Sequence, residues 1–374
     1  MSEDERGDGA GKAPENGPGD GTDDGTGSEG ENGRQSRFVR TPESLLALND
    51  GVWMAFALQA AVKLDLFSKA GEKEGLPVPE LAKAMGTDPR ATNFLVTALA
   101  AMDLVKRDGA GVRLSEFSRK HLLPESPHCL AAAIRHQANL VPAWANLADC
   151  VRTGKKAPRP APGTEEEKES RERERFRDFL SGMRDIARAG PEFPEGALDL
   201  SGPKRLLDLG GGPGTRAARL CAKNPSLAAA VFDRPAAEPL AAAEFERLGV
   251  AERIVFVGGD FLKDELPRGF DAVLLSQVLH GEPGANVPVL LKKAMGTLVP
   301  GGKIAVLECL LDDSLDGPLR PALFNLNMLV RTDGGSALTR AGLRLALEEA
   351  GAANPREIDA SPPPGNFVFV GDKL

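Results

Sequence analysis

The chain has 374 residues, 41 % of them hydrophobic and 27 % charged, so most of it can bury a core as ordinary soluble proteins do. Its length predicts two globular domains plus tails. The formal net charge of -8 argues against nucleic acid as a partner, because nucleic-acid affinity comes mainly from clustered Lys and Arg. The cysteines are scattered without a C-x-x-C pair, which predicts reduced packing residues and no metal site; they are Cys129, Cys150, Cys221 and Cys309.

Residues 1–38 are mostly Gly, Asp, Glu, Asn, Ser and Pro, so they predict a disordered acidic tail that has too few apolar side chains to fold. The N-terminus lacks the basic-then-apolar pattern of a signal sequence. No apolar run reaches the roughly 18–20 residues of a membrane-spanning helix. We therefore expect a cytoplasmic protein without a membrane partner.

Residues 39–175 predict a mainly helical domain, because apolar residues recur at helical spacing from about Thr41. The segments VPELAKAMG and DPRATNFLVTALAAMDLVKRDG read as two helices joined by a turn, and VRLSEFSRK as the end of a short β-wing. Asp88 and Pro89 fit an N-cap followed by proline in the first turn. A further apolar segment, from Cys129 to Gly154, adds long helices.

This winged-helix-like pattern invites a DNA-binding hypothesis. On the second helix, however, only Arg90, Thr92 and Asn93 are suited to contact base edges, and the helix has a long apolar side. We favour a dimerisation platform, and a DNA-binding regulator is the remote alternative.

Residues 155–175 are rich in Pro and then in Glu and Arg, which predicts a mobile loop running into a solvated helix start. From about Phe176 a helix leads into residues 176–374, where short apolar runs alternate with helical patterns. The runs are RLLDL, AAAVFD, IVFVGGD, DAVLLSQ and KIAVLEC. Strands that alternate with helices indicate a doubly wound, Rossmann-like α/β domain, whose parallel sheet is covered on both faces.

The strongest local signal is an apolar strand that ends at Leu209 and breaks into a Gly-rich turn before a helix near Thr215. Such a turn lets a ligand approach the backbone closely, so we expect a nucleotide-like cofactor there. Thr215 stands where the dinucleotide fingerprint has its last small residue, and Asp208 is awkward beside a pyrophosphate. A carboxylate there suits a ligand with a positive end, such as an amino group. The predicted cofactor residues of this segment are Asp208, Gly210, Gly212 and Gly214.

Acidic residues also follow the next two predicted strands. Asp233 comes about 25 residues after Asp208, where a carboxylate can accept hydrogen bonds from both ribose hydroxyls. Asp260 and Phe261 place a carboxylate and an aromatic face where an adenine can lie. Ligands bind at the carboxyl ends of such strands, so we interpret the three acids as one cofactor site.

The motifs LDLGGGPG, VFDRP, GGDF, LLSQVLH, LVPGGKIAVLE, LNMLV and LEEAG occur in this order between about Thr41 and the C-terminus. In this the chain resembles the class I S-adenosylmethionine-dependent O-methyltransferases of the plant caffeate and bacterial polyketide type. The resemblance implies S-adenosyl-L-methionine as cofactor and S-adenosyl-L-homocysteine as product. It further implies in-line methyl transfer to a hydroxyl of a small aromatic acceptor, without a metal, in a homodimer built on the winged-helix-like module.

The resemblance makes His280, at the end of LLSQVLH, the general base, and Glu308 the group that orients it. A neutral imidazole with a pKa near 6.5 can take a proton from a phenol. The candidate catalytic set is His280, Glu308 and Glu282. The family's His-Asp-Trp is here His280-Gly281-Glu282, and its second glutamate is replaced by Ser336 and Ala337. This departure leaves open C- or N-methylation, or a reaction other than methylation, on the same scaffold.

Phe179 and Met183 match positions that close over cofactor and acceptor in the family, with core packing as the alternative, and Asn327 and Met328 match positions that line its acceptor cavity. Four further positions are assigned to the cofactor, namely Phe179, Met183, Arg234 and Ser276. Four are assigned to the acceptor, namely Asn327, Met328, His136 and Trp144. Because the chain has no tyrosine, we expect an apolar acceptor cavity with few polar anchors.

Overall fold

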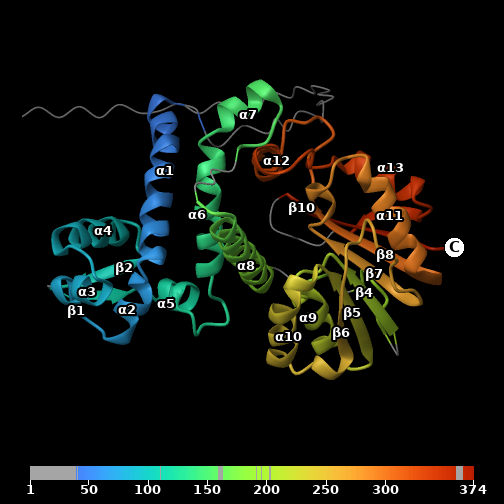
Figure 1. Cartoon of the computed structure of the whole chain (residues 1–374), viewed down its shortest axis with the longest axis horizontal. Coiled ribbons are helices and arrows are strands. Elements are labelled where there is room, and N and C mark those ends of the chain that lie inside the picture. Colours follow the sequence, from blue (N-terminus) through green and yellow to red (C-terminus); the bar gives the residue numbers. More distant parts are fainter. Residues whose placement is uncertain are drawn as a thin grey trace, which may run out of the picture. The chain divides into compact units, whose positions relative to one another are not determined.

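The computed structural model describes residues 39, 41–109, 111–158, 163–190, 192–194, 196–201, 204–358 and 365–374 (Figure 1). The predicted acidic tail, residues 1–38, lies outside the described residues. The chain divides into two compact units, residues 1–50 and residues 51–374. The described part of the first unit includes the start of helix α1 (Pro42–Lys63).

The N-terminal part has the predicted helix-turn-helix with a wing. Its elements are α1, α2 (Leu66–Glu72), β1 (Leu76–Pro77), α3 (Val78–Met85), α4 (Pro89–Ala101), β2 (Val105–Asp108), β3 (Gly111–Leu114) and α5 (Glu116–Leu122). The strands form a small sheet in the order β1-β3-β2. At the start of α4, the side chain of Asp88 accepts a hydrogen bond from Ala91 N at 2.8 Å, as an N-cap does.

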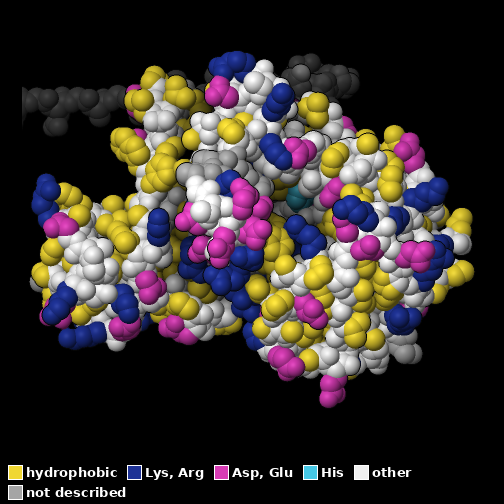
Figure 2. Space-filling view, in the orientation of Figure 1, with side chains coloured by type: hydrophobic (Ala, Val, Ile, Leu, Met, Phe, Trp, Pro, Cys, Tyr) yellow, Lys and Arg dark blue, Asp and Glu magenta, His cyan; other side chains and the backbone are white. Residues whose placement is uncertain are grey.

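Helix α1 corrects one expectation, because by length and composition alone it is apolar enough to cross a membrane. A core helix of a soluble protein passes the same test. Its large apolar side chains are nevertheless exposed in the single chain, namely Leu45, Leu46, Leu48, Val52, Trp53, Met54 and Phe56. Hydrophobic side chains gather along α1 in the space-filling view (Figure 2), and an exposed apolar surface of this kind marks an interaction site.

The middle of the chain contains three helices: α6 (Ala131–Trp144), α7 (Leu147–Thr153) and α8 (Glu165–Ala189). Helix α8 begins at Glu165, so the predicted solvated helix start is confirmed for residues 165–175, whereas the helix expected from about Phe176 begins earlier than predicted. A capping box made by Thr164 and Glu167 starts the helix. The predicted boundary between residues 175 and 176 falls inside α8, and the division into domains at that point stays a prediction.

Helices α6 and α8 pack closely against each other. Gly182 of α8 allows this approach, because a Cβ atom there would lie 3.0 Å from the Cβ of His136. The buried carboxylate of Asp185 accepts a hydrogen bond from Ala132 N at 3.0 Å and so caps the start of α6. These contacts make α6 and α8 one packed pair.

The catalytic half contains the expected parallel sheet with helices on both faces (Figure 1). Its strands are β4 (Lys204–Leu209), β5 (Leu227–Asp233), β6 (Ile254–Gly258), β7 (Phe270–Ser276), β8 (Leu298–Cys309), β9 (Ala353–Ile358) and β10 (Asn366–Asp372). Its helices are α9 (Thr215–Lys223), α10 (Glu238–Arg247), α11 (Asn286–Thr297), α12 (Leu319–Arg331) and α13 (Arg340–Glu349). The predicted Rossmann-like fold is confirmed.

The seven strands lie in the order β6-β5-β4-β7-β8-β10-β9. The strands from β6 to β8 are parallel, and β10 pairs antiparallel with both β8 and β9. Alternate residues of β4 enter two cores, with Leu206 packed among residues of α9 and α10, and Leu207 among residues of α11 and α13. After β4 the chain adds strands toward one edge, then returns at β7 and builds toward the other. The carboxyl ends of β4 and β7 therefore form the topological switch point, where such sheets bind ligands.

We expect Gly182→Val to lower the free energy of unfolding by about 1–3 kcal/mol, because the side chain would force α6 away from α8. Urea denaturation measures this change. Gly296→Val is the matched control, since Gly296 is an exposed glycine of α11 with nothing within 4 Å of an added Cβ. Equal stability losses in the two variants would contradict the importance of the α6–α8 approach.

Candidate active site at the switch point

The glycine turn after β4 faces the loop after β7. Gly210 and Gly212 have φ values of 75° and 54°, which favour glycine. A Cβ on Gly210 would lie 2.7 Å from a methyl carbon of Val278, so the two loops touch. Gly214 serves packing, because a Cβ there would lie 2.7 Å from the ring of Phe245. The turn thus stays narrow and leads directly into α9.

Asp233, at the end of β5, faces this turn. Its Oδ2 accepts a hydrogen bond from Gly212 N at 2.7 Å, and its Oδ1 accepts one from Arg234 N at 2.6 Å. Burial raises the pKa of this carboxyl, while the two backbone hydrogen bonds oppose the rise. Each carboxylate oxygen can accept a second hydrogen bond, so both remain able to bind ligand hydroxyls.

Asp208 is the unusual group of the site. It is 1 % exposed, and neither of its carboxylate oxygens has a hydrogen-bond partner among the described residues. The carboxylate lies against the glycine turn, because a Cβ on Gly211 would be 2.6 Å from Oδ2. Burial raises the pKa of Asp208 to about 7; the charge of Asp233 adds to the rise and that of Arg216 opposes it. A buried acceptor without a donor suits a ligand amino group.

The third predicted acid is engaged in its own turn. Asp260 Oδ1 accepts a hydrogen bond from Leu262 N at 3.0 Å, and Oδ2 pairs with Lys263 Nζ at 2.9 Å. The bond from Lys263 lowers the pKa of Asp260. Phe261 is half-buried against the core, and Ser276 ends β7 beside the switch point. A cofactor role for these residues stays a prediction.

Two side chains of α8 that the sequence analysis missed lie at this site, Leu180 at the glycine turn and Phe176 at Arg234. Leu180 Cδ2 lies 3.8 Å from the position that a Cβ of Gly212 would take. The guanidinium of Arg234 lies 4.4 Å from the ring centroid of Phe176. Phe176 and Leu180 are four residues apart, and this spacing is the signal that could have placed both on one face of the helix.

The other predicted residues of α8 lie beside α6. The ring of Phe179 contacts that of His136, with centroids 5.3 Å apart, and Met183 is half-buried. Burial, together with the positive charge of Arg331, lowers the pKa of His136 to about 4. His136 is therefore a neutral imidazole at physiological pH.

His280 and Glu308 form a hydrogen-bonded pair beside the glycine turn. His280 Nδ1 lies 2.7 Å from Glu308 Oε2. The other oxygen, Oε1, accepts hydrogen bonds from Val278 N and Leu279 N, both at 2.7 Å, and Cys309 N donates to Oε2 at 3.3 Å. Glu308 is 1 % exposed, so this carboxylate is buried with its acceptor capacity used. Since an ionised carboxylate only accepts, Nδ1 carries a ring proton, and in the neutral imidazole Nε2 then has a free lone pair.

The two departures from the family pattern lie close to this pair. Glu282 accepts a hydrogen bond from Asn286 Nδ2 at 3.1 Å, and its catalytic role stays a prediction. A Cβ on Gly335 would be 2.5 Å from the carbonyl oxygen of His280. The loop in which Ser336 replaces the expected second glutamate therefore packs directly on the His280 turn.

Helix α12 brings predicted acceptor residues to the same region. Trp144 Nε1 donates a hydrogen bond to Asn327 Oδ1 at 3.1 Å, which links α6 with α12. Phe324, three residues before Asn327, meets the His280 ring edge-on, with centroids 4.7 Å apart. Met328 is buried. Other residues of α12 line a hollow of about 670 Å³ together with the segment after α7 and the loop at residues 332–336.

Fold and site together define a doubly wound enzyme that takes a nucleoside cofactor with a positively charged end. An O-methyltransferase domain model matches residues 144–352, and an O-methyltransferase dimerisation domain model matches residues 46–123. The chain belongs to the class I S-adenosylmethionine-dependent O-methyltransferases.

Two curated relatives are similar over nearly their whole length. The 3-hydroxy-5-methyl-1-naphthoate 3-O-methyltransferase of Streptomyces sahachiroi is 30 % identical, over 89 % of this chain and 95 % of the relative. The tetracenomycin polyketide synthesis 8-O-methyltransferase of Streptomyces glaucescens is 32 % identical, over 90 % and 98 %. Among solved structures, human N-acetylserotonin methyltransferase in complex with S-adenosylmethionine is 27 % identical with a TM-score of 0.77, over 91 % of this chain and 99 % of that one.

The residues of this chain fit the cofactor of the family. The unpartnered carboxylate of Asp208 suits the positive amino end of S-adenosyl-L-methionine, and Asp233 suits its ribose hydroxyls. The glycine turn leaves the backbone accessible between them. The enzyme uses S-adenosyl-L-methionine.

Asp208→Asn tests the buried carboxylate through the pH dependence of stability. The pKa of Asp208 is about 7 in the folded protein and about 3.9 in an unfolded chain, so the folded state holds an extra proton between these values. Its contribution to stability therefore falls as pH rises from about 4 to 7. We expect the free energy of unfolding of Asp208→Asn, relative to wild type, to increase across that window. Urea denaturation without cofactor at several pH values measures it, and a pH-independent difference would contradict the assignment.

Proposed function

We propose that this enzyme methylates a hydroxyl group of a small aromatic molecule of the phenolic or polyketide type, with His280 as general base. The observation that carries the proposal is the hydrogen bond from His280 Nδ1 to the buried carboxylate of Glu308. The names of the two Streptomyces relatives, a hydroxynaphthoate and a tetracenomycin polyketide O-methyltransferase, support the acceptor class.

The tautomer of the His280 ring determines which nitrogen receives the proton of the acceptor hydroxyl. S-adenosyl-L-methionine supplies an electrophilic methyl group. His280 Nε2 accepts the hydroxyl proton as the acceptor oxygen becomes the nucleophile, which is the work of a general base. Glu308 holds the tautomer and stabilises the imidazolium that forms, because its negative charge lies at Nδ1.

The acceptor is oriented by a largely apolar wall with a polar anchor. Phe324 packs edge-on against the His280 ring and limits where an aromatic acceptor can lie. The indole N–H of Trp144 holds the amide oxygen of Asn327, so the amide NH2 is the half of that side chain that can donate to an acceptor oxygen. His136 and Met328 belong to the same wall.

The proposed assembly is a cytoplasmic homodimer. The dimerisation-domain match at residues 46–123 and the exposed apolar side chains of α1 support a second copy of the chain as the partner. Burial in a dimer accounts for an apolar helix such as α1 without a membrane.

Replacing the base gives the direct test. We expect His280→Ala to lower kcat by about 10²–10⁴-fold while the Kd for S-adenosylhomocysteine stays within about twofold of wild type. Hydroxylated aromatic acceptors are screened with isotopically labelled methyl donor, and mass analysis locates the label. Label on carbon or nitrogen, or a wild-type rate in His280→Ala across pH, overturns the proposal.

Glu308→Gln tests the tautomer specifically. The glutamine can keep one oxygen for the N–H groups of Val278 and Leu279, while its NH2 group donates to His280 Nδ1. The ring must then carry its proton on Nε2, so kcat should fall on the order of 10²–10⁴-fold, with cofactor binding retained. Calorimetric titration with S-adenosylhomocysteine checks the fold of the variant. Retained kcat would mean that Glu308 does not set the tautomer.

A further inference from the structure

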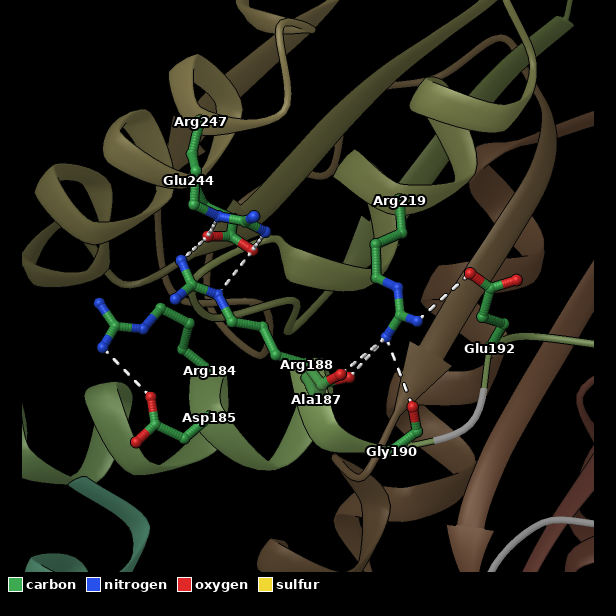
Figure 3. A network of polar contacts seen from close by, with 9 residues as sticks. All are labelled: Arg184, Asp185, Ala187, Arg188, Gly190, Glu192, Arg219, Glu244 and Arg247. Atoms are coloured by element: carbon green, nitrogen blue, oxygen red, sulfur yellow. Dashed lines mark hydrogen bonds and ion pairs between the residues drawn. The ribbon is translucent and has the colours of Figure 1, made fainter. Parts of the chain in front are cut away.

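The C-terminal end of α8 is held by an ion-pair cluster on α10 that the reaction itself does not use (Figure 3). At its centre is Glu244, whose side chain is fully buried. Arg188 of α8 donates from Nε to Oε1 at 3.2 Å and from Nη2 to Oε2. Arg247, from the same helix as Glu244, donates from Nη2 to Oε1 at 2.8 Å and from Nε to Oε2 at 3.0 Å. Both oxygens therefore receive two N–H groups.

The charge state of this cluster is well defined. Burial alone would raise the pKa of Glu244, but hydrogen bonds from Arg247 and Arg188 lower it to about 2. The carboxylate is thus ionised throughout the physiological range. Each guanidinium group also donates two hydrogen bonds to the carboxylate of Glu244. This bidentate geometry fixes the direction of the guanidinium and makes the link from Arg188 to Glu244 rigid.

A third arginine binds the same end of α8. Arg219 of α9 donates from Nη1 to the carbonyl oxygen of Ala187 at 2.8 Å and from Nη2 to Glu192 at 3.3 Å (Figure 3). The last carbonyls of a helix lack partners within the helix and carry partial negative charge, so a guanidinium there is favourable. The end of α8 is therefore fixed to both α9 and α10.

Helix α8 also connects this end with both ligand regions. Arg188 lies eight residues after Leu180, about 12 Å along a helix. Leu180 covers the glycine turn, and Phe176 lies under Arg234 next to Asp233. Through Gly182 and Asp185, α8 is packed on α6. A shift of the C-terminal end of α8 would thus displace Leu180 from the glycine turn.

We propose that Arg188 and Glu244 are positioning residues for methyl transfer. Their ion pair, which we call the α8 clamp, sets the position of α8 in which Leu180 packs on the glycine turn and Phe176 packs under Arg234, next to Asp233. It acts through these contacts and touches neither cofactor nor acceptor. When the binding-competent position of α8 is only partly populated, the apparent affinity for the cofactor falls in proportion to that population. Loosening the clamp therefore weakens cofactor binding. This inference rests on cofactor binding at the glycine turn and is independent of the acceptor.

The two arginines offer a matched pair of variants. Arg188→Gln and Arg247→Gln each remove one guanidinium from the same carboxylate and leave the other, so Glu244 is never left unpaired. Only Arg188 belongs to α8. We expect the Kd for S-adenosylhomocysteine, measured by calorimetry, to rise about tenfold in Arg188→Gln and to stay within about twofold in Arg247→Gln. Arg188→Lys keeps the charge without the fork and should lie between wild type and Arg188→Gln.

Two further readouts separate positioning from a general loss of structure. Without cofactor, the backbone amides at residues 184–190 should exchange hydrogen faster in Arg188→Gln than in Arg247→Gln, because only the first loosens the end of α8. At saturating cofactor, the kcat of Arg188→Gln should approach that of wild type while its KM for cofactor rises. If Arg188→Gln does not fold, Arg188→Lys and Arg247→Lys give the same comparison.

An unchanged Kd in Arg188→Gln, or an equal rise in both glutamine variants, overturns the α8 clamp. Neither result bears on His280 or the acceptor, because S-adenosylhomocysteine binding requires no methyl transfer. Conversely, absence of a methylated product from the wild-type enzyme, together with the expected rise in Kd in Arg188→Gln alone, would count against the proposed function and leave the clamp standing.

Discussion

The buried carboxylate of Glu308 is the constraint on which the active site depends. It lies one residue before the end of β8, yet its shortest hydrogen bonds come from the loop after the neighbouring strand β7, where it accepts from two backbone N–H groups and from His280. The same loop carries Val278, which packs against the narrow glycine turn after β4. One side chain therefore aligns the imidazole, the loop that carries it and the cofactor turn. A fully satisfied buried network of this kind is rigid, and each member holds the others in place.

The two carboxylates below the cofactor turn differ because their surroundings differ. Asp233 receives two backbone hydrogen bonds, whereas Asp208, at the end of the adjacent strand, receives none among the described residues. Desolvation outweighs the opposing charge of Arg216 and raises the pKa of Asp208 to about 7. A cation there favours the ionised carboxylate, so ligand charge and protein charge stabilise each other. These two surroundings fit a ligand that is positive at one end and carries hydroxyls at the other.

Much of this arrangement follows from sequence patterns, and the remainder depends on contacts between distant segments. Five apolar runs predicted the strands up to β8, because βα alternation dictates a parallel sheet. The antiparallel strands β9 and β10 were not predicted, since their pairing with β8 lies outside that alternation. The start of α8 was hidden by its charged residues, although Thr164 and Glu167 form a capping box. The spacing of Phe176 and Leu180 indicates a shared helix face, but their partners, Arg234 and the Gly212 turn, lie far along the chain and leave no local pattern.

The missing second glutamate is compatible with a general-base mechanism for a geometric reason. An imidazole has two nitrogens, and Glu308 already occupies Nδ1. A second carboxylate that bonded directly to the ring would have to use Nε2, the nitrogen that must stay open to receive the acceptor proton. Further acids near the ring can therefore contribute only charge or contacts with the acceptor. Because Glu308 is the hydrogen-bond partner of Nδ1, the replacement of the second glutamate by Ser336 leaves the proposed base with its orienting carboxylate.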